Sequence, residues 1–174
     1  MVPGEVRVTI VDYLQKFVRY LLEKINMTSP TPASDHFLNV CPNDEQKLLD
    51  EERAEAFHHG VAQLLFAMPW ARNNIQTAVA FLTTRVQAPD QDDWRKLRRL
   101  LQYLRGVIQM PLILRADSLN VIKWWVDASN AMHGDMRGHT GAEMLLRCGS
   151  VISMSKKKKN QYVELDESRY ISRG

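Results

Sequence analysis

Asp127 is the residue of this sequence whose position best suits metal-ion chemistry. It follows the apolar run at residues 121–126 and precedes the small residues Ala128 and Ser129. A carboxylate at the end of a buried strand is unfavourable unless it binds a cation or finds hydrogen-bond donors. Nucleases use such a residue to hold Mg²⁺, although their sites need several carboxylates. On the pattern alone, an Asp that ends a strand and begins a turn is the commoner interpretation.

A basic helix face in the segment 94–108 is the second candidate site. Its cations are Arg95, Lys96, Arg98, Arg99 and Arg105. Side chains at this spacing can follow a phosphate backbone through salt-sensitive contacts that do not read the base sequence. An ordinary solvated helix face explains the same pattern, so the residues alone leave both interpretations open.

The lysine run at residues 156–159 provides two further candidate nucleic-acid contacts, Lys156 and Lys157. Such a run is typical of nuclear-localisation or nucleic-acid-binding segments, and equally of plain solvated charge. The sequence contains no zinc motif, no Gly-rich phosphate loop and no nucleophile elbow. The motifs therefore point to no small-molecule substrate.

Charge is divided unevenly along the 174 residues. The net charge is +3, but residues 1–93 hold 8 Lys and Arg against 13 Asp and Glu, whereas residues 94–174 hold 15 against 7. A basic second half favours a polyanionic partner such as nucleic acid.

No run reaches the roughly 18 apolar residues of a membrane span, and the N-terminus lacks a signal-peptide pattern. With Cys41 and Cys148 isolated, we expect reduced thiols in an intracellular protein, cytoplasmic or nuclear, without membrane contact.

Hydrophobic periodicity predicts an α+β fold. The pattern predicts a strand at residues 5–11, helices at 12–26, 44–68, 75–86 and 90–108, and short antiparallel strands at 112–114, 121–126, 143–146 and 150–154. Pro30 and Pro32 make the segment 28–34 a linker, because it cannot remain helical. Pro69 is expected to interrupt the second helix for the same reason.

Together these segments resemble the polyprotein of copia-type retrotransposons, over residues 5 to 160. The resemblance rests on motifs in matching order: Val6-Arg-Val-Thr-Ile-Val-Asp-Tyr13, Thr31-Pro-Ala-Ser-Asp-His-Phe37, Gln76-Thr-Ala-Val-Ala-Phe-Leu82, Leu101-Gln-Tyr-Leu-Arg-Gly106, Val121-Ile-Lys-Trp-Trp-Val-Asp-Ala-Ser129, Asp135-Met-Arg-Gly-His-Thr-Gly141 and Ser150-Val-Ile-Ser-Met-Ser155. It implies that residues 1–27 are the end of a reverse-transcriptase palm with its first helix and that 28–43 is a linker. Residues 44–110 would be a thumb-like helical bundle or connection, and 111–174 an incomplete antiparallel ribonuclease H-like sheet.

The resemblance also assigns roles to the candidate residues. In this family the thumb grips the template–primer duplex, which favours the nucleic-acid interpretation of the basic helix. Asp127 would be the first metal-binding carboxylate of the ribonuclease H site, where the family uses Mg²⁺.

Departures from the family pattern imply that the chain alone has no catalytic activity and binds no cofactor. The Tyr-x-Asp-Asp motif of the polymerase is expected upstream of residue 1. An ungapped alignment puts Arg169 where the second nuclease ligand belongs, and the third ligand would follow Gly174. Two alternatives remain: a subunit that completes a polymerase or nuclease with another chain, and a co-opted nucleic-acid or protein interaction module. The oligomeric state is not predicted.

Overall fold

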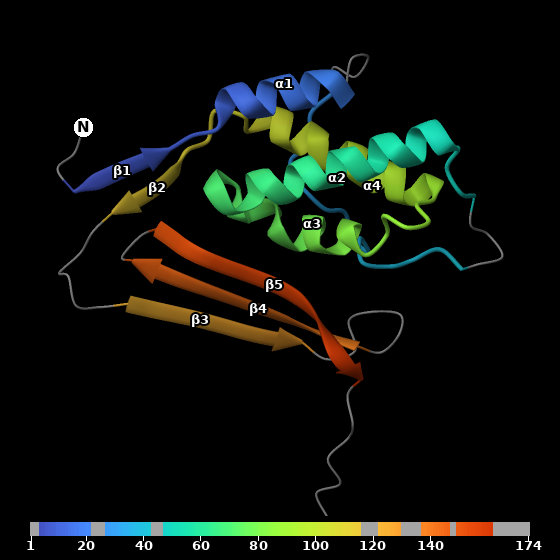
Figure 1. The fold of residues 1–174 in the computed structure, drawn as a ribbon. Helices are drawn as coiled ribbons and strands as arrows, with labels where there is room; N and C mark the ends of the chain where they lie inside the picture. Colours follow the sequence, from blue (N-terminus) through green and yellow to red (C-terminus); the bar gives the residue numbers. More distant parts are fainter. Residues whose placement is uncertain are drawn as a thin grey trace, which may run out of the picture.

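The fold is that of a computed structural model, which describes residues 4–21, 27–42, 47–115, 122–129, 137–146 and 149–161. It confirms the predicted α+β class, with an N-terminal strand, a group of helices and antiparallel sheets (Figure 1). In chain order the elements are β1 (Glu5–Val8), α1 (Val11–Leu21), α2 (Glu51–Ala71), the 3-10 turn η2 (Asn73–Ile75), α3 (Gln76–Thr83), α4 (Gln91–Gly106), β2 (Leu112–Arg115), β3 (Ile122–Ser129), β4 (Arg137–Leu146) and β5 (Gly149–Gln161).

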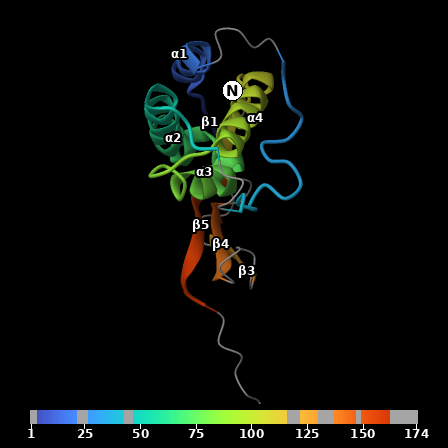
Figure 2. The same ribbon diagram turned by 90° about the vertical axis from the view of Figure 1, so that its right-hand side faces the viewer.

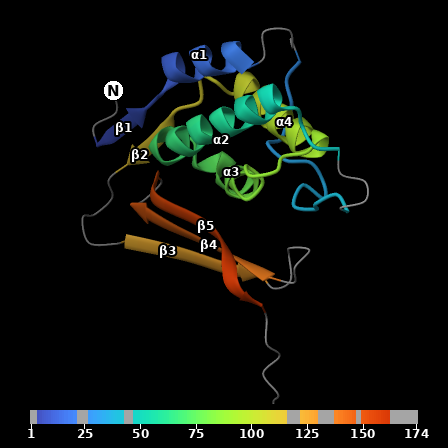
Figure 3. The ribbon, with the colours of Figure 1, turned by 45° about the vertical axis from the view of Figure 1, so that its right-hand side comes forward.

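The helices form one layer, and the sheet β3-β4-β5 forms a second layer next to α3 (Figures 1 and 2). The strands β1 and β2 lie at the side of the helical layer, where α1 begins (Figure 3). No helix in the described part of the chain is long and apolar enough to cross a membrane.

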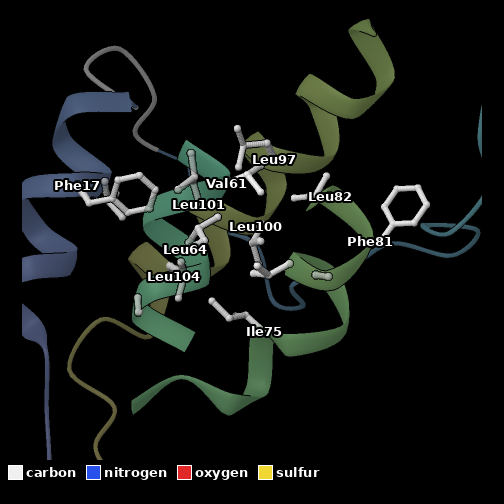
Figure 4. Close-up of a cluster of buried hydrophobic side chains, with 14 of the residues drawn as sticks. Phe17, Val61, Leu64, Ile75, Phe81, Leu82, Leu97, Leu100, Leu101 and Leu104 are labelled. Atoms are coloured by element: carbon white, nitrogen blue, oxygen red, sulfur yellow. The ribbon is translucent and has the colours of Figure 1, made fainter. Parts of the chain in front are cut away.

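A single apolar cluster holds the four helices together. Phe57, Val61 and Leu64 recur at helical spacing on α2, and Leu97, Leu101 and Leu104 do so on α4, so each helix presents one apolar stripe. Labelled side chains from α1, α2, η2, α3 and α4 meet between the helices, whereas Phe81 lies on the far side of α3 (Figure 4). The stripes that predicted the helices are therefore the stripes that build the core.

Two sheets replace the single set of strands that the sequence predicted after residue 111. Strand β2 pairs antiparallel with β1, from Glu5 opposite Arg115 to Val8 opposite Leu112. The second sheet has the order β3-β4-β5 and is antiparallel throughout. The assignment of residues 112–114 to the later strands was thus wrong, because local patterning reveals that a segment is a strand but not which strand it pairs with.

The predicted interruption at Pro69 was also wrong, because α2 continues through it to Ala71. Proline removes one helical hydrogen bond, but Pro69 is exposed and lies close to the helix end, where the freed carbonyl can face solvent. Helix α2 begins at Glu51, after the N-cap Asp50, rather than at residue 44. The predicted helix end at 22–26, Cys148 and Arg169 lie outside the described residues.

Candidate nucleic-acid interface

Helix α4 carries the candidate interface, and its first turn is fixed by a capping box. The Asp90 carboxylate accepts hydrogen bonds from the backbone N–H groups of Asp92 and Asp93, both at 2.8 Å. Asp93 Oδ2 in turn accepts from the backbone N–H of Asp90 at 3.1 Å. Both arrangements satisfy amide groups that have no partner within the helix. Asp92 and Asp93 also lie where the positive end of the helix dipole favours carboxylates.

Arg85, in the turn before α4, forms ion pairs with Asp90 and Asp93. Its Nε lies 3.0 Å from Asp93 Oδ2, and its Nη2 lies 3.6 Å from Asp90 Oδ2. Burial raises the pKa of the Asp93 carboxyl, and the hydrogen bond from Asp90 and the Arg85 charge oppose that shift. These aspartates therefore stabilise the helix start.

Lys96 belongs to the interior and not to the exposed basic face. Its side chain is 8% exposed, and its Nζ donates to the Asn39 carbonyl at 2.5 Å and lies 2.9 Å from Asp92 Oδ2. The ammonium group also lies 4.7 Å from the ring centroid of Phe81 and 5.8 Å from that of Phe37. With these contacts, the ammonium group is engaged within the fold and is not presented for binding phosphate.

The other cations of α4 differ in how far they reach solvent. The Arg95 side chain is 71% exposed and makes a surface ion pair with Asp92, at 3.1 Å. Arg98, Arg99 and Arg105 are half-buried. Arg99 Nη2 donates to Thr31 Oγ1 at 2.9 Å, whereas the Nε atoms of Arg98 and Arg99 are buried without a hydrogen-bond partner. The exposed basic face is thus narrower than the sequence predicted, and Arg95 is its most accessible member.

The described part of the linker, residues 28–42, explains this narrowing because it packs against α4. Figure 2 shows it in light blue, running down beside the helix. Phe37 anchors it in the core, with its ring centroid 5.4 Å from that of Phe81. A hollow of about 620 Å³ remains between the linker and α4, lined by Arg95, Lys96, Arg99 and His36 together with Asp35 and Asp92, among others. No local pattern in the sequence indicated that the linker covers the basic helix.

The lysine run lies in the other layer, on β5. Lys156 is exposed and pairs with Thr140 of β4, and Lys157 pairs with His139. The side chain of Lys157 lies outside the described part of the structure. The sheet and α4 occupy different layers, so the two groups of candidate nucleic-acid contacts come from separate parts of the fold (Figure 3).

Asp127 lies within β3, opposite Gly141, and not at the strand end as predicted. It lines a hollow of about 720 Å³ between the inner face of the sheet and the turn that joins α2 to α3. Burial lowers the pKa of nearby His139, whose Nε2 lies 2.6 Å from Ser155 Oγ. Across the described ranges, no three His, Cys, Asp or Glu side chains lie close enough to hold a metal ion. The described residues alone therefore do not supply a Mg²⁺ site around Asp127.

Comparison with known proteins reveals similarity to a transposon protein. The chain is 25% identical over 166 residues to the retrovirus-related Pol polyprotein from transposon TNT 1-94 of Nicotiana tabacum. The match covers 91% of this chain but only 12% of that protein. No family model matches the chain, and no solved structure matches it.

Proposed function

We propose that this chain is a segment of a retroelement polyprotein, running from the end of a copia-type reverse transcriptase into the start of its ribonuclease H region. The observation that carries the proposal is the similarity to a transposon Pol polyprotein along 91% of the chain. The order of elements agrees with it: strand and helix first, then a helical layer, then an antiparallel sheet with Asp127 on its first strand.

Within such a polyprotein the segment contributes contacts to nucleic acid rather than catalysis. Arg95, Arg98 and Arg99 on α4 would touch the phosphate backbone of a template–primer duplex, because arginine pairs well with phosphate and stays charged. The resemblance puts Arg169 where a second nuclease carboxylate belongs, and a cation there would repel Mg²⁺. The chain alone is therefore proposed to be inactive as polymerase and nuclease.

Titration of a fluorescent template–primer duplex at several salt concentrations tests the binding. We expect the logarithm of the affinity to fall linearly with the logarithm of salt. Changing Arg95, Arg98 and Arg99 to Gln should weaken binding and lower this slope by about one for each arginine that touches a phosphate. Arg53→Gln is the matched control, since Arg53 is an exposed arginine on α2 that pairs with Asp50. A salt-independent affinity, or an equally weakened affinity in the control, would refute the assignment.

Cleavage of an RNA–DNA hybrid tests the inactivity. The purified chain with Mg²⁺ should give no cleavage above buffer. If cleavage occurs and Asp127→Asn abolishes it, the chain is a nuclease and this part of the proposal fails.

A protein-interaction module is the second candidate function, favoured by the outer face of the sheet. Register places Ile122, Trp124 and Val126 on the face of β3 that also carries Ile152 and Met154 of β5. All five are exposed, and β3 is the edge strand among the described strands of this sheet. Exposed apolar faces and free strand edges favour protein contacts. Concentration-dependent association in sedimentation experiments that Val126→Lys abolishes would support this function over the first.

A further inference from the structure

Strand β3 has a free edge among the described strands of its sheet. In the order β3-β4-β5 it pairs there with β4 alone, and Figure 1 shows it as the strand farthest from the helices. Proteins usually protect such an edge with a bulge, a proline or charged side chains. The register of β3 with β4 is regular, and its sequence contains no proline. Its outer backbone groups can therefore pair with a further strand.

The charged residues of β3 are arranged for pairing with an identical strand. Lys123 and Asp127 lie two positions on either side of Trp125, so all three residues share one face. When two copies of β3 pair antiparallel about a two-fold axis at Trp125, Lys123 of each copy lies directly opposite Asp127 of the other. Opposite charges at directly opposed positions attract, whereas like charges would repel the second copy. The strand is thus complementary to itself in charge.

No other symmetric register joins these two charges. Opposed residues of an antiparallel pair share a face, so the two-fold axis must lie at a residue and not between two residues. An axis at Trp124 puts Lys123 opposite Trp125, and an axis at Val126 puts Asp127 opposite Trp125. The axis at Trp125 also sets Trp124 opposite Val126, and a pair of an aromatic and a β-branched side chain stabilises a sheet.

Both charges are available for this contact. Lys123 and Asp127 are exposed, and neither forms an ion pair within the part of the chain that the structure describes. Glu143 of β4 is a diagonal neighbour of Lys123 on the same face, but no ion pair joins them. Trp125 is 65% exposed, so pairing at this edge would also remove apolar surface from water.

Strand β5, at the other side of the sheet, lies against other elements of the fold. At its start, a Cβ added to Gly149 would lie 2.6 Å from the Ile113 carbonyl oxygen of β2. Further along, Ser155 Oγ donates to Thr77 Oγ1 of α3 at 3.4 Å. The edge of β3 is therefore the more accessible of the two, and pairing of one edge with itself closes as a dimer instead of growing into a fibre.

We propose that a second copy of this chain pairs antiparallel with β3, edge to edge, with Lys123 opposite Asp127 at both ends of the contact. The two sheets then form one continuous sheet across the dimer. This pairing rests on the protein-interaction function, the second candidate above, and names its partner. It is separate from the nucleic-acid contacts proposed for α4.

Reversal of each charge tests the register. In sedimentation equilibrium at low salt, Lys123→Glu should weaken dimerisation about tenfold, and so should Asp127→Lys, because each puts like charges opposite one another twice. The double variant with both changes should dimerise like the parent, since its opposed charges are complementary again. Lys16→Glu and Glu55→Lys are the matched controls, because they make the same charge changes at exposed helix positions.

A mixture of the two single variants gives the sharpest test. Each variant repels itself, but Lys123→Glu and Asp127→Lys chains complement each other at both contacts. Energy transfer between donor-labelled and acceptor-labelled chains should therefore be stronger in the mixture than in either variant alone. In the parent, amide exchange of β3 should slow as the protein concentration rises. This last readout needs no variant, so it holds even where a substitution lowers stability.

The outcomes separate this pairing from the broader interaction function. A parent chain that stays monomeric up to millimolar concentration overturns both. Association that Val126→Lys weakens and that neither charge reversal changes overturns the edge pairing alone, and leaves the outer face of the sheet as the contact. Recovery of dimerisation in the double variant and in the mixture supports the pairing. Circular dichroism confirms that each variant keeps the fold of the parent.

Discussion

The Lys96 ammonium group donates a hydrogen bond to the Asn39 carbonyl at 2.5 Å, which ties α4 to a linker 57 residues earlier in the chain. The same nitrogen lies beside Asp92 and over the ring of Phe81. A cation with these neighbours holds the linker in place and is withdrawn from the surface. Lys96 and Arg95 are adjacent in sequence and yet differ in exposure, since the Arg95 side chain is 71% exposed and that of Lys96 8%.

We expect Lys96→Met to destabilise the fold by about 1–2 kcal/mol, since it removes a charged hydrogen bond and two ring contacts. Duplex binding should keep its salt slope, because Lys96 does not face solvent. Arg95→Gln should do the reverse, with a stability change below about 0.5 kcal/mol and a salt slope lower by about one. Urea unfolding and duplex titration of both variants measure the two effects. A lower salt slope in Lys96→Met would show that the lysine reaches the ligand.

The two N-cap aspartates should differ in their contribution to stability. Asp90 is buried, accepts two backbone hydrogen bonds and lies near Arg85. Asp50 caps α2 through one hydrogen bond, from Arg53 N at 2.9 Å, and is exposed. We expect Asp90→Ala to cost about 2 kcal/mol and Asp50→Ala about 0.5–1 kcal/mol. The free energies of unfolding in urea give the comparison, and equal destabilisation would contradict the role of burial.

Gly149 should be intolerant of any side chain. An added Cβ would lie 2.6 Å from the Ile113 carbonyl oxygen and 2.8 Å from Leu114 Cα, so it would collide with the backbone of β2. We expect Gly149→Ala to cost about 2 kcal/mol or to separate β5 from β2. Gly141→Ala is the control, because its nearest neighbour would be the Met154 carbonyl oxygen at an ordinary 3.8 Å. Amide hydrogen exchange of β5 and β2 reports the separation; unchanged protection in Gly149→Ala would count against this close packing.

Glu5 should titrate below its ordinary value, because hydrogen bonds from Arg7 and then Arg115, both at 2.6 Å, lower the pKa of its carboxyl. A folded-state pKa below the unfolded value means that this pairing stabilises the fold above the unfolded pKa. The stabilisation is lost as pH falls through the folded-state pKa. Carboxyl chemical shifts measured against pH give the pKa of Glu5 directly.

Variants of the two arginines extend that measurement. Arg7→Gln should raise the Glu5 pKa more than Arg115→Gln, since the bond to Arg7 has the larger effect. A site-specific readout is required because the pKa of Asp93 shifts in the opposite direction and would partly offset Glu5 in global unfolding. An unchanged Glu5 pKa in both variants would rule out the bridge between β1 and β2.

Local sequence signals predicted much of the fold. The stripes through Phe57 and Leu64 on α2, and through Leu97 and Leu104 on α4, identified both helices, because a buried helix face repeats every three to four residues. The Asp90 cap is equally local, since its partners lie within three residues along the chain. The pairing of β2 with β1 was missed, because it joins residues 110 positions apart.

The sequence alone determined the α+β class, the helix faces and the resemblance to a retroelement polyprotein, because these depend on residue types and spacing along the chain. Only the tertiary structure decided which candidate residues are accessible. The linker packs on α4 and withdraws Lys96. Antiparallel pairing puts Glu143 beside Asp127 in one cleft. Both outcomes depend on contacts between distant segments, and a charge pattern along the chain does not show which charges are neutralised across the fold.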